Sequence, residues 1–318
     1  MILPRPTSAR LSLTTSSAVL FSDTNKIRVL ILGGSGMLGN AVFRHLSQDP
    51  KLEVYATIRK PLAKKDFSAA QHKHILSGVD VENNRSLSAT IKRIKPAVVI
   101  NCIGIVKQLE DSHDALKSIP INALLPHQLT NICQMTGARL ILISTDCVFS
   151  GRKGNYTELD FADCDDLYGR SKLLGEIANS PHVLTIRTSI IGHEIVSKNG
   201  LLEWFLSQKG EVGGFKNAIF SGLTTTELAR LLKDIILHEK NLFGLFHVST
   251  KPISKYDLLQ LIAKVYQKNI KIKPRIEPKI NRSLSSRVFS KKTGYKTKSW
   301  PVLIQEMLTE FTNSALKK

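Results

Sequence analysis

Residues 26–46 read KIRVLILGGSGMLGNAVFRHL, and this stretch decides the fold class of the chain. Its apolar beginning predicts a buried strand, its glycine-rich middle a tight turn, and its end an amphipathic helix. Glycines in such a turn let the backbone approach a phosphate group, and the helix N-terminus offers N–H donors to that phosphate. A purely structural turn is the alternative. In this strand–turn–helix setting we expect dinucleotide binding by the turn residues Gly33, Ser35, Gly36, Met37, Leu38 and Gly39.

Apolar strands and helices alternate from this stretch as far as Arg187. Such alternation is typical of a parallel sheet that helices cover on both faces. We therefore predict an α/β fold, a Rossmann doubly wound parallel sheet, with a dinucleotide-binding domain at residues 25–187. Further strands are expected at 52–59, 74–79, 97–102, 139–144 and 182–187, and further helices at 86–95, 120–137 and 168–178.

The pattern becomes irregular after Arg187. We expect residues 188–318 to form mainly a smaller C-terminal substrate-binding cap over the carboxyl edge of the sheet, with about 224–249 returning to the Rossmann domain. Helices are expected at 200–208, 224–239 and 255–266, a strand at 245–249 and an isolated strand at 271–276.

Residues 1–24 are rich in Ser and Thr and contain no acidic residue before Asp23. We expect a disordered N-terminal extension outside the fold and a cytoplasmic protein. An organelle transit peptide has the same composition and is the alternative. No apolar run approaches the ~20 residues that span a bilayer, so we expect a soluble protein without a membrane partner.

The formal net charge is +19, and residues 251–318 carry sixteen Lys or Arg against four Asp or Glu. These cations are scattered among apolar positions, without the aromatic pattern or helix-turn-helix signature of a nucleic-acid-binding protein. We expect a solvated basic surface and no nucleic-acid partner. The four cysteines form no C-x-x-C pair and the nine histidines no H-E-x-x-H motif, so no metal site is predicted.

Candidate cofactor contacts stand where the predicted strands end. An acidic residue at the end of the second strand would bind the adenosine ribose and repel a 2′-phosphate. Arg59 and Lys60 stand there instead, which favours NADPH over NADH; solvated loop charges are the alternative. Asp80, after the third strand, is a candidate for the adenine edge or a simple strand end. The fourth strand ends in the small-residue turn that contains Asn101, Cys102 and Gly104.

Hydroxyl groups and a Tyr–Lys pair follow. The fifth strand ends in Ser144-Thr145-Asp146, and Tyr168 and Lys172 stand four residues apart on the next predicted helix. Residues at this spacing share a helix face, which sets a phenol beside an ammonium group. Such a pair also arises by chance in a chain this rich in Lys and Arg, so the rest of the sequence must decide its meaning.

A glycine loop, hydroxyls after the fifth strand and a Tyr–Lys pair, in this order, resemble the extended short-chain dehydrogenase/reductase family from residue 26 to 312. The stretches STDCVFSG (144–151), GNYTELD (154–160), YGRSKLLGE (168–176) and RTSIIG (187–192) are most similar to the dTDP-4-dehydrorhamnose reductases. The resemblance implies NADPH- or NADH-dependent reduction of the C4 keto group of a nucleotide-linked 4-keto-6-deoxy sugar, for polysaccharide synthesis such as O-antigen. Related dehydratases carry Asp-Glu after the Thr, and Cys147 here disfavours dehydration.

The resemblance also implies roles for single residues. Tyr168 would donate a proton, Thr145 would hydrogen-bond the same oxygen, and Lys172 would lower the pKa of Tyr168 and hold the nicotinamide ribose. Lowering that pKa by ~3 units takes about 4 kcal/mol, which requires a cleft that excludes water. The substrate-binding candidates are Ser144, Asp146, Lys107, Arg282 and Arg287, of which the two arginines would bind the diphosphate or merely lie on the surface.

Two rival functions fit the same fold. One is a nucleotide-sugar epimerase that keeps its NAD bound. The other is a non-catalytic NADP-binding regulatory subunit, as occurs in a methionine adenosyltransferase subunit. The sequence leaves open the nucleotide base, the sugar, the C4 stereochemistry and whether the chain forms a homodimer.

Overall fold

A computed structural model describes residues 26–61, 67–195 and 198–315 of this 318-residue chain. The extension predicted at residues 1–24 lies outside the described residues. Among the helices that the structure describes, none is both long and apolar enough to cross a bilayer.

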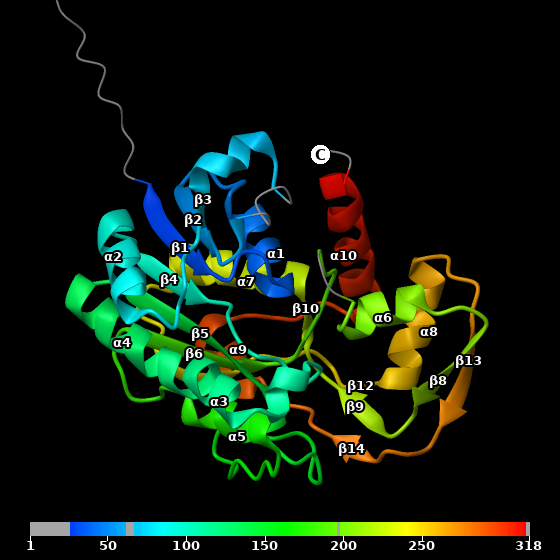
Figure 1. Cartoon of the computed structure of the whole chain (residues 1–318). Coiled ribbons are helices and arrows are strands. Elements are labelled where there is room, and N and C mark those ends of the chain that lie inside the picture. The colour runs from blue at the N-terminus through cyan, green and yellow to red at the C-terminus, as the bar shows by residue number, and fades with distance from the viewer. Residues whose placement is uncertain (1–25, 62–66, 196–197, 316–318) are drawn as a thin grey trace, which may run out of the picture.

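A seven-stranded parallel sheet forms the centre of the molecule (Figure 1). Its strand order is β11-β6-β5-β4-β1-β2-β3, and every neighbouring pair is parallel. The predicted Rossmann fold is therefore confirmed. The strands are β1 Ile27–Leu32, β2 Leu52–Ile58, β3 Ile75–Ser77, β4 Val98–Asn101, β5 Arg139–Thr145, β6 Val183–Thr188 and β11 Gly244–His247.

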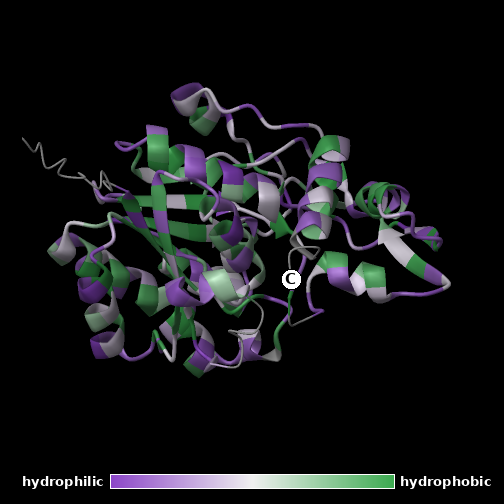
Figure 2. Ribbon diagram, turned by 90° about the horizontal axis from the view of Figure 1, so that it is seen from above, coloured by the Kyte–Doolittle hydropathy of each residue, from purple (hydrophilic) through white to green (hydrophobic). Residues whose placement is uncertain are grey.

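Apolar residues on both faces of each central strand explain why helices cover the sheet twice. In β1, Val29 and Ile31 belong to one buried cluster and Leu30 and Leu32 to another, because successive strand residues point to opposite faces. The first cluster is closed by α1 (Met37–Leu46) and α7 (Thr225–His238), and the second by α2 (Asn84–Ile94) and α4 (Leu125–Thr136). Figure 2 shows the hydrophobic strands between these helices.

The helix predicted at 120–137 begins earlier than expected. A helical segment runs from α3 (Ala115–Ser118) through a π-helical turn, η4 (Ile119–Leu124), into α4. The Asp114 side chain accepts a hydrogen bond from the backbone N–H of Leu116 at 2.9 Å and so caps the start. The predicted start at Pro120 was wrong because a proline is compatible with this π turn.

The cap has a core of its own, beside the sheet in Figure 1. Its elements are α6 Leu201–Ser207, β8 Glu211–Phe215, β9 Ala218–Phe220, β12 Ile253–Ser254, α8 Lys255–Val265, β13 Lys271–Arg275, β14 Ile280–Asn281 and α10 Trp300–Ala315. β13 pairs in parallel with β8, so the prediction of an isolated strand at 271–276 was wrong. Two glycines in β8, Gly213 and Gly214, hid that strand from the sequence pattern.

The chain returns from the cap to the sheet at two points. β10 (Leu223–Thr224) pairs with β7 (Ile190–Ile191), α7 then packs on the α1 face, and β11 becomes the edge strand beside β6. Later, α9 (Arg287–Thr293) places Phe289 in the same buried cluster. The domain boundary at residue 187 itself stays a prediction.

Candidate active site

A cleft lies at the point where the strand order of the sheet reverses, so that the connections after β1 and β4 leave in opposite directions. The carboxyl ends of β1 and β4 are neighbours there, and ligands of open α/β sheets bind at such a switch point. The cleft has a volume of about 470 Å³ and lies between the ends of β1, β4 and β5 and the cap. It brings together the three predicted catalytic residues, Thr145, Tyr168 and Lys172.

Two glycines of the turn, Gly33 and Gly39, have separate steric reasons. Gly33 has a φ of +84°, which favours glycine, and its N–H donates to Thr57 Oγ1 at 3.3 Å. A Cβ at Gly39 would lie 2.1 Å from the Gly33 carbonyl oxygen. Gly36 caps α1 without a side chain, and it lines the cleft with the two residues that follow it. Gly36, Met37 and Leu38 therefore face the cleft, while Gly33, Ser35 and Gly39 shape the turn outside the lining.

The turn after β4 lies where the sequence predicts it. Asn101 Oδ1 accepts from the Ile103 N–H at 3.1 Å and so supports the turn, and Cys102 and Gly104 line the cleft beside it. Burial raises the pKa of the Cys102 thiol to about 12, so it stays protonated. Asn122, which sequence reasoning missed, exchanges two 3.0 Å hydrogen bonds with the backbone of Ile105 and holds the following loop. Asn122 lies in the π turn, a feature common at functional sites, but this turn becomes visible only in the structure.

Arg59 and Asp80 are not brought into this cleft. Both side chains are exposed, at the ends of β2 and β3. Asp80 Oδ1 accepts from the Glu82 N–H at 3.1 Å, as a residue that ends a strand would. Their roles toward the adenosine half of a cofactor stay predictions.

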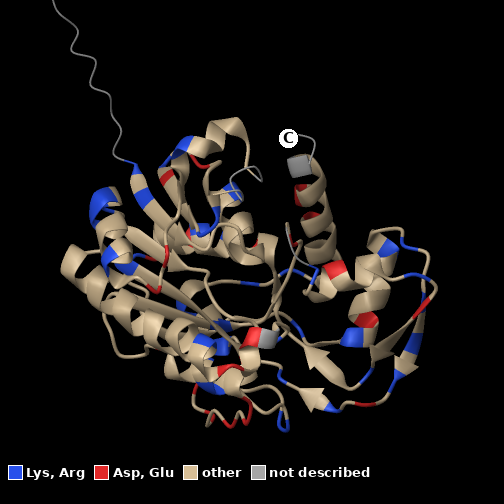
Figure 3. Ribbon diagram, in the orientation of Figure 1, with Lys and Arg blue, Asp and Glu red and all other residues tan. Residues whose placement is uncertain are grey.

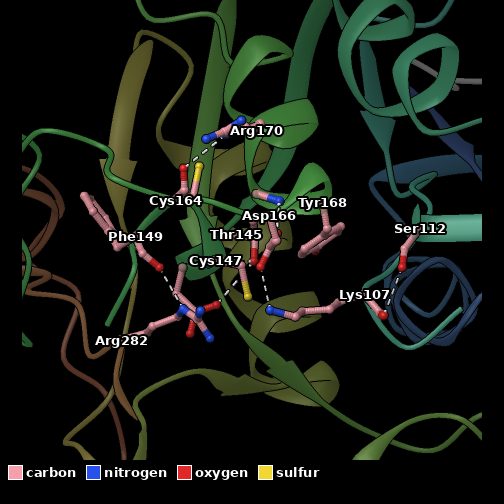
Figure 4. A network of polar contacts seen from close by, with 12 residues as sticks. Lys107, Ser112, Thr145, Cys147, Phe149, Cys164, Asp166, Tyr168, Arg170 and Arg282 are labelled. Atoms are coloured by element: carbon pink, nitrogen blue, oxygen red, sulfur yellow. Dashed lines mark hydrogen bonds and ion pairs between the residues drawn. The ribbon is translucent and has the colours of Figure 1, made fainter. Parts of the chain in front are cut away.

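Helix α5 (Leu167–Leu174) carries Tyr168 and Lys172 to the end of β5. The Asp166 side chain caps it by accepting from the Gly169 N–H at 2.7 Å. A Cβ at Gly169 would lie 2.3 Å from the Cys147 carbonyl oxygen, so only glycine permits this close packing. The packing brings Tyr168 and Thr145 to the same cleft. Figure 4 shows Tyr168 beside Asp166 and Thr145.

Burial moves the pKa values of the pair in opposite directions. It raises the pKa of Tyr168 well above its ordinary value, and a hydrogen bond with Thr145 opposes the rise. It lowers the pKa of Lys172 to about 8, against the nearby Glu176 carboxylate. Lys172 Nζ donates to the Ile143 carbonyl at 2.8 Å. The net shift of the Tyr168 pKa is upward, and its lowering by Lys172 stays a prediction.

A buried polar network lies behind the cleft, and sequence reasoning missed it. Ser144 Oγ donates to Glu176 Oε1 at 2.5 Å, and Arg187 donates to both Glu176 oxygens at 2.8 and 2.6 Å. Arg187 Nη1 lies 3.2 Å from His247 Nε2, and burial lowers the pKa of His247 to about 4. Ser144 lines the cleft, but its hydroxyl is committed to Glu176. The available signal is the position of Glu176, four residues after Lys172.

The predicted substrate cations separate into two groups. Lys107 Nζ pairs with Asp166 at 2.6 Å, and Arg282 Nε donates to the Phe149 carbonyl at 2.7 Å; both side chains line the cleft (Figure 4). Arg287 lies exposed at the start of α9 and outside the cleft lining, so the structure does not bring it to the site. Asp146 is buried in the cleft wall, and burial raises its pKa while Arg282 opposes the rise.

The family model for the RmlD substrate binding domain matches residues 27–313, which is almost all of the described chain. This chain belongs to that family. The match spans the glycine turn, the Tyr168–Lys172 pair and the whole cap. Family membership confirms the resemblance to the extended short-chain reductases and to the dTDP-4-dehydrorhamnose reductases among them.

Both curated proteins and solved structures are similar to this chain. The chain is 25% identical over 258 residues to methionine adenosyltransferase 2 subunit beta of Danio rerio, covering 75% of this chain and 74% of that protein. The chain spans less than half the length of several mammalian beta subunits that it also matches.

Among solved structures, dTDP-4-dehydrorhamnose reductase of Bacillus anthracis, in complex with NADP, has a TM-score of 0.74 at 21% identity, covering 90% of this chain and 99% of that one. WbmG of Bordetella bronchiseptica, in complex with NAD and UDP, has a TM-score of 0.73 at 17% identity, covering 91% and 96%. At these identities the two likenesses concern the fold.

Proposed function

We propose that this chain is an NAD(P)H-dependent oxidoreductase that reduces the C4 keto group of a nucleotide-linked 4-keto-6-deoxy sugar. The observation that carries the proposal is the convergence of Thr145, Tyr168 and Lys172 with the glycine turn on one cleft. Membership of the RmlD substrate binding domain family supports the reaction type. A dTDP-linked sugar and a UDP-linked N-acetyl sugar are both candidate substrates, and the product would serve polysaccharide biosynthesis.

The cleft residues fit a dinucleotide. The N-terminal N–H groups of α1 carry no capping side chain at Gly36, which leaves them available to phosphate oxygens. Gly104 and Lys172 line the cleft side by side, and a Cβ at Gly104 would lie 3.8 Å from Lys172 Nζ, in ordinary contact. When bound, the cofactor supplies the hydride. Arg59, exposed at the end of β2, supports NADPH over NADH.

Tyr168 is suited to give a proton to the reduced substrate. Its raised pKa keeps the phenol protonated at neutral pH, which is the form that a proton donor needs. Thr145 holds the same oxygen through its hydroxyl, and Lys172 orients the ribose of the cofactor.

The cleft also provides cations for a diphosphate. Lys107 and Arg282 line it from the loop after β4 and from the segment after β14. Guanidinium groups bind phosphate oxygens in pairs, so Arg282 is the stronger of the two candidates.

A regulatory subunit is the second candidate function. The observation that favours it is the 25% identity over 258 residues with methionine adenosyltransferase 2 subunit beta. In that case the cleft would bind a dinucleotide, and the chain would act by binding a protein partner rather than by turnover.

NADPH oxidation by the purified protein separates the two candidates. The protein is offered dTDP- and UDP-linked 4-keto-6-deoxy sugars, with Tyr168→Phe as the test variant and Tyr55→Phe, in the second strand, as the control. We expect turnover that falls at least about 100-fold in Tyr168→Phe, the scale of general-acid catalysis, and stays unchanged in the control. NADPH binding without reduction of any keto sugar would transfer the proposal to the regulatory subunit.

A further inference from the structure

Lys255 brings a cation into the cleft from the cap. It is the first residue of α8, directly after the N-cap residue Ser254, which accepts from the Asp257 N–H at 3.0 Å. Its side chain lines the same cleft as Thr145 and Tyr168. The sequence pattern offered no signal for it, since a lysine at a helix start is ordinarily a solvated residue.

The Lys255 ammonium has no partner of its own. Within the described residues it makes no hydrogen bond or ion pair, and the charged groups that act on it are Asp146 and Arg282. The carboxylate on its own helix, Asp257, accepts from the Ser254 hydroxyl instead, at 2.6 Å. Burial lowers the pKa of Lys255, which is the cost of keeping a cation partly out of water without a contact anion.

The charges around Lys255 do not balance. Asp146 is one carboxylate, and it faces both Lys255 and Arg282. The remaining cleft cation on this side, Lys107, is already paired with Asp166. Glu194 also lines the cleft but accepts from the Gly200 N–H at 2.9 Å, so Arg282 and Lys255 share the Asp146 carboxylate in a partly buried site, where an anionic ligand would be favoured.

Arg282 is held ready for such a ligand. Its Nε donates to the Phe149 carbonyl, and its aliphatic part packs on Gly151, where a Cβ would lie 3.1 Å from Arg282 Cγ. The guanidinium is thus fixed from behind, and little side-chain entropy is lost when it binds a ligand. Figure 4 shows it beside Cys147 and below Phe149.

We propose that Lys255 and Arg282 together form a subsite for a phosphate group of the ligand, next to Asp146. The inference rests on the proposed function, because it takes a nucleoside diphosphate as the ligand. It adds one cap residue, Lys255, that recognises this ligand. A diphosphate would supply the missing negative charge and contact both cations at once. The cap then selects the ligand by its charge, and Thr145 and Tyr168 act on the attached sugar.

Calorimetric titration of the full chain with UDP and dTDP tests the subsite. Lys255→Met removes the cation, and Lys264→Met removes the same charge from an exposed position on the same helix. We expect Lys255→Met to weaken binding about tenfold or more, the scale of a charge-assisted hydrogen bond, and Lys264→Met to leave it unchanged. Lys255→Arg should retain most of the affinity. Equal affinities in the wild type and Lys255→Met would overturn the proposal.

Further outcomes distinguish free phosphate from a nucleotide as the ligand. They also distinguish failure of the subsite from failure of the proposed function. Lys255-dependent binding of inorganic phosphate without binding of either nucleotide would overturn the nucleoside diphosphate. Lys255-dependent UDP binding without reduction of any keto sugar would keep the subsite and remove the reductase. Reduction of a keto sugar with an unchanged KM in Lys255→Met would keep the reductase and remove the subsite. If Lys255→Met does not fold, protection of wild-type Lys255 from reductive methylation by UDP, with Lys264 unprotected, replaces it; absence of protection counts against the subsite.

Discussion

At the scale of single residues, Tyr168 and Lys172 illustrate how burial works on a neighbouring acid and base. The low-dielectric cleft disfavours the phenolate of one and the ammonium of the other, so both neutral forms gain. For the proton donor this means that the tyrosine keeps its proton but is a weaker acid. For Lys172, burial means that the ammonium group loses its charge at pH values used in ordinary assays.

Cofactor affinity should therefore depend on pH through Lys172. Its pKa of about 8 means that the free protein loses this positive charge as the pH rises above 8, while a bound phosphate-bearing ligand favours the charged form. We expect the Kd for NADPH to be constant from pH 6.5 to 7.5 and to rise above pH 8, by at most about tenfold per pH unit. Fluorescence titration measures it. Lys172→Met should bind weakly at every pH, and a wild-type Kd that stays flat to pH 9.5 would contradict the assignment.

Glu176 should matter more for stability than any surface acid. It is buried against Arg187, and its removal leaves a buried guanidinium without its partner. We expect Glu176→Gln to lower the free energy of unfolding by about 3–5 kcal/mol, measured by urea denaturation. Lys273→Met, which breaks the exposed pair with Glu211, should cost less than about 1 kcal/mol. A Glu176→Gln protein as stable as the control would mean that the glutamine amide and His247 together satisfy Arg187.

At the scale of elements, the position of α5 depends on one glycine. A Cβ at residue 169 would lie 2.3 Å from the Cys147 carbonyl oxygen and 2.7 Å from Cys164 Cβ. Alanine is the better helix former, yet here it would push the helix away from the end of β5.

Gly169→Ala should therefore harm the site despite its better helix propensity. We expect a loss of about 1–3 kcal/mol of stability from overpacking and a fall of about 100-fold in kcat/KM as Tyr168 moves from Thr145. Leu174→Ala, at an exposed position of the same helix, is the control. Denaturation and steady-state kinetics measure the two effects, and a Gly169→Ala protein with wild-type values in both would show that the helix can adjust.

The elements differ in how well local sequence could predict them. The sheet strands carry runs of Val, Ile and Leu, so their places followed from pattern alone. The start of the helical segment at Ala115 did not, because its cap is a single Asp114 hydrogen bond and prolines stand inside the segment. The pairing of β8 with β13 joins residues far apart in the chain, and local patterns contain no information about such partners.

At the scale of the whole molecule, the site consists of parts that the sequence predicted to different degrees. The glycine turn, Thr145, Tyr168 and Lys172 follow from short motifs on predictable elements. Lys255 and the Glu176–Arg187 pair become visible only once the cap and β6 are placed against the cleft. Arg287, for which the sequence left open a diphosphate contact or a surface position, lies exposed and outside the cleft lining.

The distribution of charge also belongs to this scale. Figure 3 shows Lys and Arg along the helices and loops of both the sheet region and the cap, rather than gathered in a single element. A field of this kind attracts anionic ligands from a distance and weakens with salt. Specificity must then come from the few cations inside the cleft.

The return of α7 and β11 to the sheet has a consequence for anyone who wishes to handle the sheet domain as a separate module. A gene fragment that stops after β6 would encode a sheet with one unprotected edge and an uncovered face, where Leu228, Leu232 and Ile235 now pack. Such a fragment invites aggregation, since open edges and apolar patches recruit other chains. The sheet domain consists of separate segments of the chain. An expressed version would need residues 223–249 joined to the first segment by a linker.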